Sequence, residues 1–92
     1  MNATDSREAV LAQLAEFRLA LDAALPGDAV QRVHYHVDRL EQALRSSHAE
    51  GIRFAAYTIA HTLATGSEQF PPAAVRAFEG LRTALEQAGH RF

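Results

Sequence analysis

The five histidines are the residues most able to bind a metal, because the chain has no cysteine. Ligands on one helix must lie three or four residues apart to share a face, and no two histidines have that spacing. His34 does share a helix edge with Asp38 and Glu41, which could hold an ion if another helix supplied further ligands. The alternative is a solvated polar edge on which Glu41 pairs with Arg45. We favour this alternative and predict no metal site.

Catalytic patterns are missing from the sequence. It contains no G-x-S-x-G turn, no phosphate-binding glycine loop and no evident pair of carboxylates for acid–base chemistry. The faces that periodicity predicts to point inward are almost wholly aliphatic or aromatic. We therefore predict that the protein is not an enzyme and needs no cofactor.

A cluster of aromatic and polar side chains lies between residues 47 and 66. At 100° per residue, Phe54, Tyr57 and His61 fall on one side of a helix, and Glu50 shares that side. The opposite side carries a second apolar set, made of Ile52, Ala56, Ile59 and Leu63. A surface helix has one apolar stripe, so a helix with two is buried or sandwiched. This helix should pack on its own chain with one side and on something else with the other.

Three hypotheses explain the side that carries Phe54, Tyr57 and His61. Aromatic residues are enriched in protein interfaces, so the first is a surface, over about residues 48–65, through which the chain self-associates. In the second, His61 is a core histidine bonded to a backbone carbonyl. In the third, these side chains line a pocket for a small molecule, a metal or haem.

Residues 72–88 supply a second possible contact face, a row of small residues: Ala73, Ala77, Gly80 and Ala84. Glycine in the middle of a helix costs about 1 kcal/mol relative to alanine. The close approach of a neighbouring helix backbone would explain Gly80. We include Ala77 and Gly80 in the predicted interface.

Four helices must position these residues. Apolar spacings of three and four predict helices over about 5–25, 28–45, 47–66 and 72–88. Capping-box patterns predict three of the helix starts, at Asp5, Asp28 and Ser47. Helix ends are predicted at Pro26–Gly27, Gly66 and Gly89. No alternating pattern of the kind that predicts a strand persists.

The junction at residues 45–48 allows two interpretations. The Ser47–Glu50 capping pattern favours a new helix, but the apolar phase runs through the junction without a shift. One bent helix over 29–65 would satisfy that phase and would be about 55 Å long at 1.5 Å per residue. We favour the break, and predict one all-α domain over residues 1–92: an antiparallel four-helix bundle with its third helix central.

Charge and composition restrict the partners. The net charge is −2, with nine arginines and no lysine, and the basic residues are interspersed rather than clustered. Nucleic-acid surfaces gather basic residues, so DNA or RNA is disfavoured, and a helix-turn-helix regulator is the weakest alternative. Arg32, Arg39 and Tyr35 share the back of the second helix and could meet an acidic partner, although a solvated face is favoured.

Several further expectations concern the cellular location of the protein and its assembly. Small domains without disulfides often gain stability by oligomerising. The sequence shows no secretory signal and no apolar run of bilayer length, so we expect a cytoplasmic protein with no membrane partner. We predict a non-enzymatic protein–protein interaction module, an adaptor, inhibitor or regulator that forms a homodimer. The main alternative is a small-ligand, metal or haem sensor.

Overall fold

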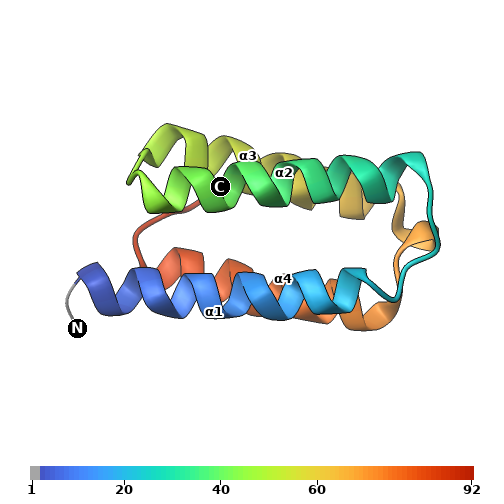
Figure 1. Ribbon diagram of the computed structural model, residues 1–92, viewed down its shortest axis with the longest axis horizontal. Coiled ribbons are helices and arrows are strands. Elements are labelled where there is room, and N and C mark those ends of the chain that lie inside the picture. Colours follow the sequence, from blue (N-terminus) through green and yellow to red (C-terminus); the bar gives the residue numbers. More distant parts are fainter. Residues whose placement is uncertain (1–2) are drawn as a thin grey trace.

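The computed structural model describes residues 3–92, with side chains from residue 6 onward. Four helices alternate in direction along the chain (Figure 1). They are α1 (Ala3–Leu21), α2 (Asp28–Arg45), α3 (Ala49–Thr65) and α4 (Pro72–Gln87), with a short 3₁₀ turn, η1 (Ser67–Gln69), before α4. The predicted all-α, antiparallel four-helix bundle is confirmed, and α2 and α3 are separate helices.

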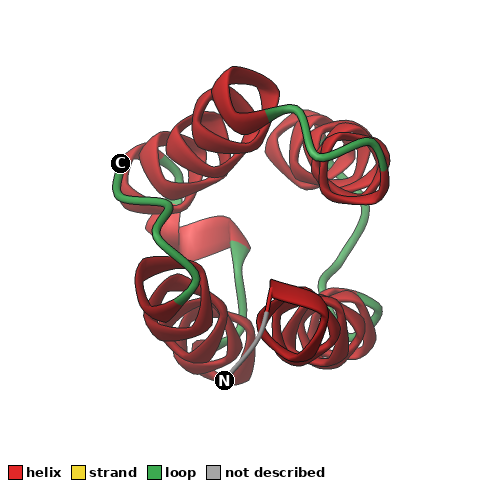
Figure 2. Ribbon diagram, turned by 90° about the vertical axis from the view of Figure 1, so that its left-hand side faces the viewer, coloured by secondary structure: helices red, strands yellow, loops and turns green. Residues whose placement is uncertain are grey.

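The four helices form two close pairs, α1 with α4 and α2 with α3. Viewed from one end, each helix occupies one corner of the bundle (Figure 2). The prediction that the third helix is central is wrong, because α3 packs closely on α2 and only weakly on α4. Its second apolar side lacks a neighbouring helix within the described chain.

The core runs along the bundle and receives one stripe from each helix. The stripes follow the predicted spacing and are almost fully buried; they include Val10, Leu14, Phe17, Val33, Val37, Leu40, Ile52, Ile59, Phe78, Leu81 and Leu85. The rings of Phe17 and Phe78 meet across α1 and α4 with centroids 5.5 Å apart. Such aromatic pairs add to the stabilisation from area burial.

The first helix ends earlier than predicted. Its last helical residue is Leu21, and the next residues form a tightened turn in which Ala24 N donates to Leu21 O at 2.9 Å. Leu25, the last residue of the predicted helix, is 82% exposed. Pro26 helps to keep Leu25 out of the helix, because proline disfavours helical geometry in the preceding residue. The helix already includes Ala3, and the side chain of Asp5, the predicted cap, lies outside the described residues.

The second helix starts where predicted but with a different cap. Gly27 is the N-cap, so Asp28 is inside the first turn and the predicted Asp28–Gln31 capping box is wrong. Gln31 N instead donates to the backbone oxygen of Gly27 at 3.0 Å. Asp28 still acts favourably there, because a negative charge in the first turn interacts well with the helix dipole.

The predicted break between α2 and α3 is confirmed, but its capping residue is His48 rather than Ser47. Ser47 has a φ of 56°, in the left-handed region. It ends α2 in a Schellman arrangement, with His48 N donating to Ala43 O at 2.9 Å. His48 then begins α3, where its Nδ1 accepts from Gly51 N at 2.9 Å. Because Ser47 completes the end of α2, it does not also cap α3.

The last helix ends as predicted and its tail folds back. Gly89, with a φ of 94°, follows Ala88, and His90 N donates to Leu85 O at 2.8 Å, which is a second Schellman ending. Phe92 then packs on Phe78, with ring centroids 6.2 Å apart. In the described part of the chain, no helix combines the length and apolar character that a membrane span needs.

Candidate interaction surface

The outward side of α3 carries the four residues that the sequence placed together. Glu50, Phe54, Tyr57 and His61 are all exposed, and Phe54 and Tyr57 are 67% and 58% exposed. They lie opposite the buried stripe of the same helix. The hypothesis that His61 is a core histidine is therefore wrong. We call these four residues the α3 face.

The rings of the α3 face are ordered by contacts with their neighbours. Tyr57 and His61 stack, with centroids 6.2 Å apart and planes inclined by only 13°. Phe54 leans toward α2, where it meets His36 edge to face at 6.4 Å. His36 in turn contacts Tyr35 at 5.1 Å. Tyr35, Phe54 and Tyr57 are the exposed large aromatic residues of the described chain, and α2 and α3 carry all of them.

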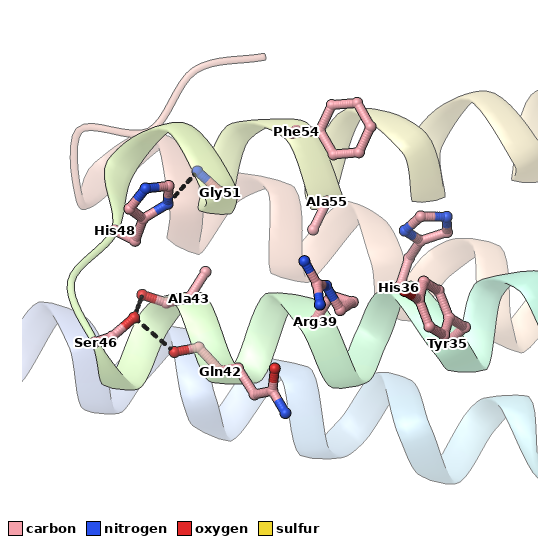
Figure 3. Close-up of a pocket in the computed structure, with 10 residues that line it drawn as sticks. All are labelled: Tyr35, His36, Arg39, Gln42, Ala43, Ser46, His48, Gly51, Phe54 and Ala55. Atoms are coloured by element: carbon pink, nitrogen blue, oxygen red, sulfur yellow. Dashed lines mark hydrogen bonds between the residues drawn. The ribbon is translucent and has the colours of Figure 1, made fainter.

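A shallow groove of about 370 Å³ lies between α2 and α3 beside the α3 face. Figure 3 shows Arg39 and His36 reaching into it from α2, and Phe54 at its rim on α3. Its ionisable side chains are arginine, histidine and tyrosine, with no carboxylate. Partial burial, together with the nearby charges of Arg32 and Arg39, lowers the pKa of His36. The Arg39 guanidinium, with no carboxylate beside it in the groove, favours an anionic over a cationic group there.

The predicted ligand pocket of Phe54, Tyr57 and His61 does not correspond to this groove. Phe54 lines it, whereas Tyr57 and His61 do not and instead stack with each other. Of the three α2 residues predicted as a possible surface for an acidic partner, Arg39 and Tyr35 line the groove.

The carboxylates of the possible ion site on α2 form ion pairs with arginines. Arg18 of α1 bonds Asp38 at 2.8 Å and Glu41 at 2.6 Å, and Arg45 bonds Glu41 at 3.1 Å. The predicted Glu41–Arg45 pair is thus confirmed, and Arg18 is an additional partner. Among the described residues, no group of three or more histidine and carboxylate side chains is placed to hold a metal. His34 is half-buried and takes no part in these ion pairs.

The remaining predicted interface residues, Ala77 and Gly80, lie apart on α4. Both are half-buried, and α4 packs chiefly on α1. A Cβ at Gly80 would lie 2.7 Å from Oε1 of Gln13. A side chain, not the backbone of a neighbouring helix, therefore approaches Gly80, which corrects our explanation for this glycine. The six predicted residues form two separate sets, of which the α3 face is the exposed one.

Two features of the surface were missed from the sequence. No predicted site includes His36, and Tyr35 was considered only with the arginines of its own helix. The signal that would join them to Phe54 is the register of the α2–α3 hairpin, in which residue 36 lies opposite residue 54.

The arrangement of α2 and α3 does not support a helix-turn-helix. That motif joins two helices at roughly 90–120°, whereas α2 and α3 run antiparallel as close neighbours.

Comparisons with protein-family models, curated proteins and solved structures give no match to this chain.

Proposed function

We propose that the protein is a non-enzymatic protein–protein interaction module, an adaptor, inhibitor or regulator, that self-associates through the α3 face. The observation that carries this proposal is the exposure of Phe54 and Tyr57, side by side on the side of α3 that points away from the core. Burying apolar surface yields about 25 cal/mol per Å², so covering two such rings would favour association.

The composition of the surface supports a protein partner. Interface cores are enriched in aromatic residues and arginine and depleted in lysine. The α3 face and the adjoining groove bring together three exposed aromatic rings and Arg39. Isolated exposed apolar residues need no explanation, but these rings are clustered, unlike Leu19 on α1 and Leu25 in the following loop.

Size-exclusion chromatography with light scattering tests the proposal. We expect a mass above the 10.1 kDa of one chain at high micromolar concentration. The double variant Phe54→Ser/Tyr57→Ser should shift toward the monomer with unchanged helicity by circular dichroism. The matched control, Leu19→Ser/Leu25→Ser, removes two comparably exposed apolar side chains elsewhere and should associate like the natural chain. Equal behaviour of the two double variants would contradict the proposal.

The groove favours a second candidate function, a sensor of a small anionic ligand. Its volume lies within the range of ligand pockets, roughly 300–1,000 Å³, and Arg39 and His36 line it without a carboxylate. Native mass spectrometry of the purified protein tests this candidate. A bound small molecule that is lost from the Arg39→Ala variant would support it, and a bare chain after screening with carboxylate and phosphate compounds would count against it.

A further inference from the structure

The residues of the α3 face have a spacing that is the same in both directions along the helix. Glu50, Phe54, Tyr57 and His61 are separated by four, three and four residues. At 100° per residue they fall within about 60° of one another. They form a narrow seam, opposite the buried side of α3, with an aromatic centre and one ionisable residue at each end.

This spacing makes the seam complementary to itself in the antiparallel direction. In a twofold-symmetric pair, each contact between two residues occurs twice, once in each direction. A twofold axis level with the midpoint between Ala55 and Ala56 would bring Phe54 opposite Tyr57 of the second copy. The same axis would bring Glu50 opposite His61 of that copy. Both pairings follow from one choice of axis.

We infer that α3 pairs antiparallel with α3 of a second copy, with the Phe54 and Tyr57 rings at the centre and a Glu50–His61 contact at each end. This inference rests on the proposed self-association and specifies its orientation and register. Helices pack about 8–10 Å apart, which allows facing side chains to meet along such a seam.

The chemistry of the two ends favours a second copy of this chain over an unrelated protein. A different partner would impose no symmetry on the spacing, whereas a second copy requires that each residue face its own complement. Glu50 and His61 are such complements, an acid and a base. Neither takes part in the ion pairs of the described residues, so both are available to a partner.

The parallel arrangement of two copies is disfavoured by the same residues. It would bring Glu50 beside Glu50 and His61 beside His61. Like charges in contact are destabilising, and parallel helices also align their dipoles unfavourably. The antiparallel arrangement places the acidic residue near the amino end of one α3 beside the histidine near the carboxyl end of the other.

Engineered cysteines can report this orientation, because the natural chain has none. Two variants, Glu50→Cys and His61→Cys, are oxidised separately and as an equal mixture. A disulfide needs Cα atoms about 4.4–6.8 Å apart. In the antiparallel pair, two copies of residue 50 are separated along the helix by about 16 Å, the rise of eleven residues. The mixture should therefore form linked dimers about tenfold faster than either variant alone.

The mixed pair also retains one natural Glu50–His61 contact, so it should form at least as readily as either homodimer. Linkage of Glu50→Cys with itself at the rate of the mixture would show a parallel pair and overturn the inference. Absence of linkage while light scattering still detects a dimer would overturn the register alone. Absence of any dimer in the natural chain as well would overturn the proposed function together with the inference.

Discussion

The rings of Tyr57 and His61 stack on the outward side of α3, with centroids 6.2 Å apart and planes inclined by 13°. The two residues are one helical turn apart, and both are exposed. Each ring restricts the rotation of the other before any partner arrives. A surface ordered in advance loses less side-chain entropy on association, which favours binding by this part of α3.

Charge reversal along the α3 face should weaken self-association, and a charge swap should restore it. Glu50→Lys removes the attraction for His61 of the partner, and His61→Glu places two carboxylates together. Each single change should raise the dimer dissociation constant several-fold, because exposed ion pairs contribute modestly and each occurs twice. The double variant Glu50→Lys/His61→Glu should recover most of the affinity, as measured by sedimentation velocity.

The control for this swap is Glu86→Lys, which makes the same charge change on an exposed residue of α4. It should leave the dissociation constant unchanged. If the free energy of association lost in the double variant equals the sum of the losses in the two single variants, Glu50 and His61 do not meet across the interface.

Ser47→Gly should stabilise the fold. The left-handed conformation at Ser47 is unfavourable for residues with a Cβ, by about 1–2 kcal/mol. Glycine adopts it freely but loses more entropy on folding, so the net gain should be roughly 0.5–1 kcal/mol in the free energy of unfolding. Urea unfolding monitored by circular dichroism measures this gain.

Ser46→Gly is the matched comparison, because Ser46 has a φ of −96° and its Oγ donates to Gln42 O at 2.9 Å. It should lower the free energy of unfolding. An equal effect of glycine at positions 46 and 47 would contradict the structural assignment of the turn.

His48→Ala should destabilise α3 by removing its N-terminal cap. The loss of a side-chain cap typically costs roughly 0.5–2 kcal/mol. His48→Asn should retain most of the stability, since asparagine also accepts a hydrogen bond from the backbone N–H of Gly51. Ser47→Ala, at the position that the sequence pattern favoured as the cap, should change stability much less. The order of the three unfolding midpoints tests which residue caps α3.

Acid should destabilise the fold through Glu41. Hydrogen bonds from Arg18 and Arg45 lower the pKa of Glu41 below its ordinary value of 4.5. Its folded-state pKa is thus below its unfolded-state value. The stabilisation is complete above about pH 4.5 and is lost as the pH falls through the folded-state pKa. Thermal unfolding of Glu41→Gln should therefore depend less on pH between about 5 and 3 than that of the natural chain.

Glu86→Gln is the control for the acid experiment, because Glu86 is absent from the ion pairs of the described residues. It should keep the acid sensitivity of the natural chain. A Glu41→Gln variant that is just as acid-sensitive would show that the contacts with Arg18 and Arg45 contribute no pH-dependent stability.

The fold could be predicted wherever apolar spacing alone decides the structure. The stripes through Leu14, Val37, Ile59 and Leu81 are buried as expected, because each helix can bury one side. Helix caps were less predictable. The side chains of Ser47 and His48 can both accept a hydrogen bond from a backbone N–H at the start of α3. Which of them caps the helix depends on how α2 ends. The placement of α3 at a corner depends on which helices pair, and periodicity within one helix carries no information on pairing.

The candidate site was predicted only within single helices. The exposure of Phe54 and Tyr57 follows from their angle to the buried stripe of α3. Their relation to His36 and Arg39 depends on the register between α2 and α3, which is set by the Ser47 turn and is not encoded in either helix separately. Gly80 was misinterpreted for the same reason, since Gln13 approaches it from another helix.

Sedimentation equilibrium of the natural chain, over a concentration range from low to high micromolar, tests the central claim most directly. The claim is that the α3 face is covered by a second copy in solution. We predict a mass that rises from the 10.1 kDa of one chain to twice that value with increasing concentration. A mass of one chain across the whole range would contradict self-association through α3.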